Sequence, residues 1–178
     1  CTFWYGHSTG TGSVLYSQYQ FNAVMLTIVL YEPQIPPNTG NIGRLCAATD
    51  TTLHIVGNIG FDLTDKKMKR AGLDYWEHID FKYFPDLDRY HRNLVQSNRF
   101  HLLTTKSPYA YTSRQFMIND YLIFGSETTG INENILTAHW ELTCTIPMKN
   151  PSIRSLNLAN SVSIVLFEAL RQINENQS

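Results

Sequence analysis

The sequence lacks the features by which several protein classes are recognised from composition alone. Its formal net charge is −1, so contact with nucleic acid would have to come from a local patch of cations. Its three cysteines, Cys1, Cys46 and Cys144, are far apart and follow no C-x-x-C or Cys/His spacing, which argues against a disulfide framework and a structural zinc site. No apolar run approaches the ~20 residues that cross a bilayer. We therefore expect a cytoplasmic protein with no membrane segment and no metal.

Phosphate-binding fingerprints are absent as well. No G-x-x-x-x-G-K-[ST] occurs anywhere, and no G-x-G-x-x-G follows the first apolar run of the chain. A Rossmann-type methyltransferase or dinucleotide enzyme is for this reason only a second interpretation.

Residues 1–24 differ from everything that follows. They contain no Lys, Arg, Asp or Glu, and they lack the basic start and continuous apolar core of a secretory signal. We expect them to be a leader or an expression-derived segment, the alternative being a native extension that packs through its aromatic residues. Residues 25–178 are then expected to form a single domain, since a chain of this length with 43% hydrophobic residues can bury one substantial core.

Strand and helix patterns alternate from Met25 onward. Short apolar runs predict strands over 26–31, 53–56, 79–84, 100–104, 121–124 and 142–146. Helices are predicted over 39–50, 64–71, 86–96, 133–138 and from about 158 to 171. The prolines of 33–37 are expected to lie outside any helix, and Asn38 to cap the first one. This alternation predicts an α/β fold with a mostly parallel sheet, helices on both faces, and ligands at the carboxyl ends of the strands.

Three loops carry residues that packing alone does not explain. Residues 37–44 hold two glycines, two asparagines and an arginine, which would let backbone approach a ligand or would merely close a turn. Residues 124–131 place a glutamate between two glycines, either fixing a ligand or facing solvent. Residues 147–157 bring Arg154, Ser155 and Asn157 to the entrance of the last helix, where unpaired N–H groups favour an anion, although a polar helix start can also simply face water.

Together the three loops resemble the SpoU branch of the SPOUT methyltransferases, which methylate ribose in RNA. The residues that match the three family motifs, in the family's order, are Asn38, Gly40, Asn41 and Arg44; Gly125, Ser126, Glu127 and Gly130; and Ile146, Pro147, Met148, Ser155, Asn157, Leu158, Ala159, Ser161 and Ser163. The short length and segments such as Leu-Tyr-Glu-Pro and Leu-Thr-Thr-Lys look most like the small tRNA enzymes that methylate the 2′-oxygen of cytidine or uridine 34. A methyltransferase acting on another tRNA or rRNA site, or a non-catalytic RNA-binding relative, is the alternative.

The resemblance implies a trefoil knot near the carboxyl end, against the general rule that connections do not thread. It also implies S-adenosylmethionine as cofactor, a homodimer, and the anticodon region of tRNA as partner. By position, the residues that would bind the cofactor are Leu103, Thr104, Gly125, Glu127, Gly130, Ile146, Met148, Ser155 and Leu158. The apolar helix face over 164–170 is a candidate dimer contact.

Catalytic roles follow from the same resemblance. Methyl transfer to a ribose needs alignment and some polarisation of a poor nucleophile. We assign Arg44, and also Arg154, to polarising the hydroxyl or holding a phosphate, and Glu127 to orienting an arginine or Asn38. Ser155 and Asn157 are expected to close the pocket.

A basic run supplies the expected RNA contact, together with Arg44. Its members are Lys66, Lys67, Lys69 and Arg70. Aromatic residues follow directly, so the run could contact phosphates while its neighbours stack on bases of a single-stranded loop. The alternative is an ordinary solvated helix face.

Overall fold

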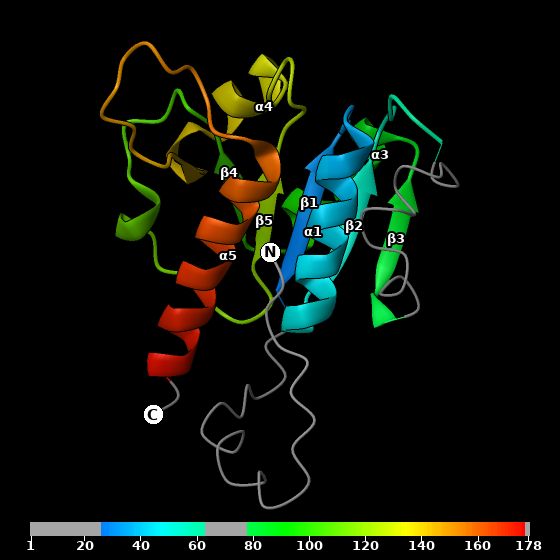
Figure 1. Cartoon of the computed structure of the whole chain (residues 1–178), viewed down its shortest axis with the longest axis horizontal. Helices are drawn as coiled ribbons and strands as arrows, with labels where there is room; N and C mark the ends of the chain where they lie inside the picture. The colour runs from blue at the N-terminus through cyan, green and yellow to red at the C-terminus, as the bar shows by residue number, and fades with distance from the viewer. Residues whose placement is uncertain (1–25, 63–77, 177–178) are drawn as a thin grey trace, which may run out of the picture.

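The structure, a computed structural model, describes residues 26–62 and 78–176. Its framework is a six-stranded parallel sheet with strand order β3-β2-β1-β5-β4-β6 (Figure 1). The strands are β1 (Thr27–Tyr31), β2 (Thr52–Val56), β3 (Phe81–Phe84), β4 (Phe100–Leu103), β5 (Tyr121–Phe124) and β6 (Thr143–Cys144). The predicted α/β architecture with a parallel sheet is confirmed.

Four described α-helices cover the two faces of the sheet. They are α1 (Pro36–Thr49), α3 (Leu87–Ser97), α4 (Glu133–Ala138) and α5 (Leu158–Glu175). Figure 1 shows α1 and α5 on the same face, where the two helices contact each other. Because every strand pair is parallel, the carboxyl ends of the strands meet at one edge of the sheet.

The sheet separates two apolar clusters. Alternate residues of β1 divide between them: Ile28 and Leu30 pack in the cluster on the α1 and α5 side, and Val29 and Tyr31 pack in the one that includes Leu94 of α3. All five residues of β1 are buried, which explains why its sequence is a continuous apolar run rather than an alternating one. The predicted inner face of α5 is confirmed, because Val162, Val165, Leu166, Ala169 and Leu170 are nearly or fully buried.

The expected start of the first helix is wrong. The helix begins at Pro36, its N-cap position is Ile35, and no side chain caps it. A proline fits the first helical positions because its φ is already helical and its missing N–H is not needed there. The segment 37–44, expected to be a turn, is therefore helical. Asn38 lies inside the first turn, and its side chain is available for other contacts.

The sixth strand is also shorter than expected. A 3₁₀ turn occupies Trp140–Leu142, so that β6 contains only Thr143–Cys144. The backbone then leaves β4 and pairs with another loop: Thr145 N donates to the Tyr109 carbonyl at 2.8 Å, and Tyr111 N donates to the Thr145 carbonyl at 2.8 Å. The expected helix over 64–71, with the cations Lys66, Lys67, Lys69 and Arg70, lies outside the described residues, as does the segment 1–24.

Candidate functional site

The loop after β1 is joined to the glutamate of the second motif. Glu127 accepts hydrogen bonds from the backbone N–H of Gln34 at 2.8 Å and of Ile35 at 3.3 Å, one on each carboxylate oxygen. It also accepts one from Nδ2 of Asn38 at 2.9 Å. The expected role of Glu127 as the residue that orients Asn38 therefore has a geometric basis.

Asn38 also forms a hydrogen bond with the third motif. Its Oδ1 accepts from Nδ2 of Asn157 at 2.9 Å, and Oδ1 of Asn157 accepts from the backbone N–H of Asn160 at 3.3 Å, which caps α5. We call Glu127, Asn38 and Asn157 the hydrogen-bond chain. A carboxylate can only accept and a helix N–H can only donate, so these two ends fix which way each asparagine amide points.

The hydrogen-bond chain is partly shielded from water. Asn38 is 6% exposed, so losing one of its two partners would leave a buried polar group unsatisfied, at a cost of about 1–3 kcal/mol. The chain therefore ties three segments, 89 and 119 residues apart in sequence, into a fixed arrangement.

The second motif folds tightly upon itself. A Cβ atom on Gly125 would lie 2.1 Å from the carbonyl carbon of Gly130 and 2.2 Å from the nitrogen of Ile131, so no other residue fits at this position. Gly130 has φ +70° and donates its N–H to the Ser126 carbonyl at 2.9 Å. The two glycines close a loop whose backbone borders a pocket.

That pocket has a volume of about 480 Å³ and lies at the carboxyl ends of β4 and β5. Most of the predicted site residues line it. They are Asn38, Leu103, Thr104, Gly125, Glu127, Gly130, Ile146, Met148, Arg154, Ser155, Asn157 and Leu158. The structure thus brings together the three loops that the sequence singled out.

Arg44 is a predicted catalytic residue that the structure does not bring into the pocket. It is exposed on α1 and does not line the cavity. Arg154 does line it, from the exposed loop before α5. Of the two arginines that the sequence left as alternatives, only Arg154 borders the pocket.

Several residues at the site were not identified from the sequence, among them Lys106 and Gln34. Lys106 lines the pocket two residues after Thr104, and Gln34 holds Glu127 through its backbone. Both follow the carboxyl end of a predicted parallel strand, and that position could have identified them. Gln34 acts through its N–H, which no side-chain pattern reveals.

Cys144 also lines the pocket, at the end of β6. Burial raises the pKa of its thiol to about 12, so the thiol stays protonated near neutral pH and is a poor nucleophile. Its contribution to the pocket is apolar. Within 26–62 and 78–176, no group of three or more His, Cys, Asp or Glu side chains could hold a metal ion, and no helix is long and apolar enough to cross a membrane.

Sequence comparison identifies the family. The profile of the SpoU rRNA Methylase family matches residues 25–167. The chain belongs to the SpoU methylase family. The resemblance inferred from the three motifs is therefore confirmed.

Individual relatives cover most of the chain. One from Yersinia pestis, named tRNA (cytidine(34)-2′-O)-methyltransferase, is 47% identical over 154 residues, which are 84% of this chain and 94% of the relative. A solved structure described as giving structural insights into the 2-OH methylation of C/U34 on tRNA has a TM-score of 0.81 at 38% identity and covers 86% of this chain and 99% of its own. The SpoU methyltransferase AviRb from Streptomyces viridochromogenes, solved in complex with AdoMet, has a TM-score of 0.70 at 24% identity and covers 84% of this chain and 58% of its own, a likeness of fold.

Proposed function

We propose that this chain transfers a methyl group from S-adenosylmethionine to the ribose 2′-oxygen of cytidine or uridine at wobble position 34 of a tRNA. The observation that carries the proposal is the convergence of the three family motifs on one pocket, with the hydrogen-bond chain holding them together. The name of the Yersinia pestis relative specifies cytidine 34 and the 2′-oxygen, and the description of the similar solved structure gives C/U34.

The pocket suits the proposed cofactor in size and in chemistry. Its volume of about 480 Å³ falls in the range of roughly 300–1,000 Å³ typical of small-molecule sites. Leu103, Ile146 and Leu158 supply apolar walls for the base and the carbon–sulfur chain, while Thr104 and Ser155 supply hydroxyl groups for the ribose. Because Gly125 has no side chain, backbone groups border the pocket there, as expected for a site in which main-chain groups contact the ligand.

S-adenosylmethionine, when bound, supplies a methyl group on a positively charged sulfonium. The protein then has to align a ribose hydroxyl and stabilise the negative charge that develops on its oxygen. We assign this stabilisation to Arg154, which lines the pocket. A guanidinium is a permanent cation in proteins, so it stabilises charge or holds a phosphate, and the proton of the hydroxyl leaves to solvent.

The remaining pocket groups position rather than react. The Glu127 carboxylate accepts hydrogen bonds from three N–H groups. It thereby holds Asn38 in place and, through Asn38, Asn157. Ser155 and Asn157 close the side of the pocket next to α5. Arg44, on the surface of α1, keeps the proposed role of an RNA phosphate contact together with Lys66, Lys67, Lys69 and Arg70.

The proposal includes a homodimer that binds the anticodon region across two subunits. Its support is the outer face of α5, where Ile164 is 37% and Phe167 is 54% exposed although both side chains are large and apolar. The trefoil knot also remains a proposal. Its support is the path from β6, at the edge of the sheet, back to α5, which lies against α1 (Figure 1). We place the reaction in the cytoplasm, where tRNA is modified and where cysteines such as Cys46 and Cys144 stay free.

Transfer of labelled methyl from S-adenosylmethionine to unmodified tRNA, followed by mapping of the modified nucleotide, tests the proposal. The most specific test uses two anticodon stem-loops. One lacks the 2′-hydroxyl at nucleotide 34, and the matched control lacks it at the neighbouring nucleotide. Transfer should vanish with the stem-loop altered at nucleotide 34 and persist with the control. Methylation elsewhere would indicate another RNA site, and RNA binding without any transfer would indicate a non-catalytic relative.

A further inference from the structure

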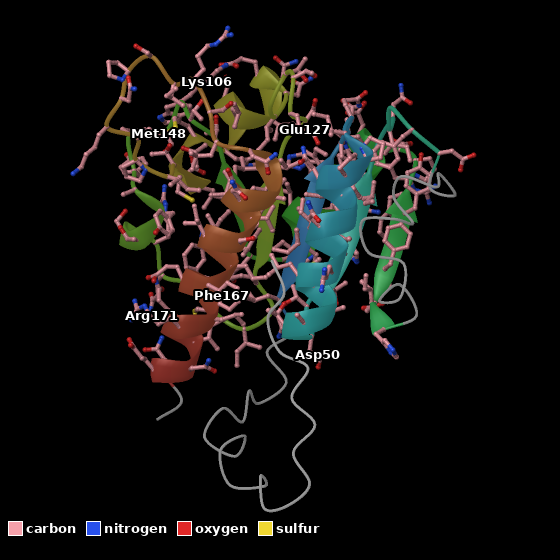
Figure 2. All side chains as sticks on the ribbon, in the orientation of Figure 1. Asp50, Lys106, Glu127, Met148, Phe167 and Arg171 are labelled. Atoms are coloured by element: carbon pink, nitrogen blue, oxygen red, sulfur yellow. The ribbon has the colours of Figure 1, made fainter. Side chains whose placement is uncertain are left out.

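Two opposite charges meet at the pocket rim from different elements. Lys106 follows β4 and lines the pocket, and its Nζ forms an ion pair with Oε2 of Glu133, in the first turn of α4. Figure 2 places Lys106 between Met148 and Glu127, above the carboxyl ends of the strands. The pair therefore lies beside the proposed cofactor site rather than on a remote surface.

The fold gains little from this pair. The Lys106 and Glu133 side chains are 57% and 64% exposed, and an ion pair with that exposure contributes little to stability. No other hydrogen bond or ion pair holds either side chain among the described residues. Both charges are therefore free to exchange partners at low cost.

The proposed methyl donor carries a matching pair of charges. Its amino-acid end is a zwitterion, with a carboxylate and an ammonium on one carbon. A neighbouring ammonium and carboxylate on the protein are complementary to that arrangement, since each can form a charge-assisted hydrogen bond. An RNA phosphate fits less well, because Glu133 would repel it.

Resting on the function proposed above, we infer that Lys106 and Glu133 recognise the amino-acid end of the methyl donor. Lys106 binds the carboxylate and Glu133 binds the ammonium, and the two side chains pair with each other when that end is absent. They are specificity-determining residues for the donor and take no part in the transfer itself.

Calorimetric titration with three thioethers tests this inference without any turnover. S-adenosylhomocysteine carries both charged groups, S-adenosyl-3-thiopropylamine lacks the carboxylate, and 5′-methylthioadenosine lacks both. Lys106→Met should weaken S-adenosylhomocysteine roughly tenfold or more, the usual effect of losing a charged hydrogen bond, while leaving the other two unchanged. Glu133→Gln should weaken the first two and leave 5′-methylthioadenosine unchanged.

Lys149→Met is the matched control, because Lys149 is an exposed lysine of the loop between β6 and α5 and does not line the pocket. It should change none of the three affinities. The exchange Lys106→Glu with Glu133→Lys should bind S-adenosylhomocysteine better than Lys106→Glu alone, because the complementary pair is restored in reverse. Unchanged thermal unfolding midpoints establish that the variants are folded.

The outcomes separate this inference from the proposed function. If the unaltered protein binds none of the three thioethers, the proposed function itself fails. If it binds them and Lys106→Met weakens all three equally, or none, the inference is overturned. It is also overturned if Lys106→Met leaves S-adenosylhomocysteine binding intact but lowers tRNA affinity with a shallower salt dependence, because Lys106 is then a phosphate contact.

Discussion

Asn38 and Glu127, 89 residues apart in the sequence, are joined by a hydrogen bond of 2.9 Å from an amide to a carboxylate. The same amide accepts from Asn157 on its other side. One buried side chain thus links the first family motif to the second and the third. The shape of the pocket depends on this link, because the three motifs lie on separate segments that meet at the carboxyl ends of the strands.

Asn38→Ala should damage the pocket more than the fold. Both Asn157 and Glu127 lose a partner, so we expect the free energy of unfolding to fall by about 1–3 kcal/mol. The rate of methyl transfer should fall by a larger factor than this loss of stability explains. Urea unfolding and single-turnover transfer measure the two effects. Asn160→Ala is the control, since it keeps the backbone N–H that donates to the capping Asn157 side chain and removes an exposed side chain. Equal losses in the two variants would contradict the importance of the Asn38 link.

Glu127→Gln keeps the size of the side chain but replaces one acceptor by a donor. An NH₂ group would then face N–H donors of Gln34, Ile35 or Asn38, so we expect a loss of about 1–3 kcal/mol in unfolding free energy and weaker S-adenosylhomocysteine binding. Calorimetry and chemical unfolding check both. Glu141→Gln, at an exposed position, should behave like the unaltered protein. An unaffected Glu127→Gln would mean that the carboxylate does not hold the loop.

Gly125→Ala and Gly130→Ala separate steric from conformational cost. The new methyl group at 125 would lie 2.1 Å from backbone, whereas the one at 130 meets no atom within 4 Å and only faces an unfavourable φ of +70°. We expect Gly130→Ala to cost about 1–2 kcal/mol and Gly125→Ala clearly more, with loss of cofactor binding. Thermal unfolding of the two variants side by side measures this order. The reverse order would contradict the close approach at Gly125.

Acid should destabilise the fold through His54, which is buried, and His91, which is half-buried. Burial, with the nearby positive charge of Lys82, lowers the pKa of His54 to about 4, and burial lowers the pKa of His91 below its ordinary value. Unfolded histidines titrate near ~6.5, so the unfolded chain binds more protons at mildly acidic pH. Stability should be fully present above about pH 6.5 and decrease as the pH falls toward 4, with about 1–2 kcal/mol lost through His54 by pH 5. Urea unfolding at several pH values measures how steeply the free energy of unfolding depends on pH. This dependence should be weaker in His54→Gln and unchanged in His78→Gln, a control at an exposed position. Equal pH dependence in the two variants would contradict the assignment.

Phe167→Glu should separate the proposed dimer. Phe167 is 54% exposed on α5, and a charge placed in an apolar interface would be buried without a partner. Light scattering should show a dimer for the unaltered protein and a monomer for the variant. Ile153→Glu, at another exposed apolar residue, should remain dimeric. A monomeric unaltered protein would remove this part of the proposal.

The sequence determined more of the fold than of the contacts within the site. Strands such as β1 and β5 were predictable because a strand buried on both faces must be a continuous apolar run. The first helix was predicted to start three residues after its structural start, because a capping asparagine and a helix-starting proline compete, and the proline determined the boundary. The short β6 was not predictable, since its length depends on where β4 ends and on the loop that pairs with Thr145.

By itself, the sequence indicated the family and named many of the residues that line the pocket, because motif residues and the carboxyl ends of predicted parallel strands can both be recognised in a sequence. Only the tertiary structure decided what those residues do to one another. It made Asn38 a link rather than a helix cap, placed Arg154 in the pocket and Arg44 outside it, and brought Lys106 to Glu133. Such pairings depend on distances between elements far apart in the chain, which local patterns of residues do not encode.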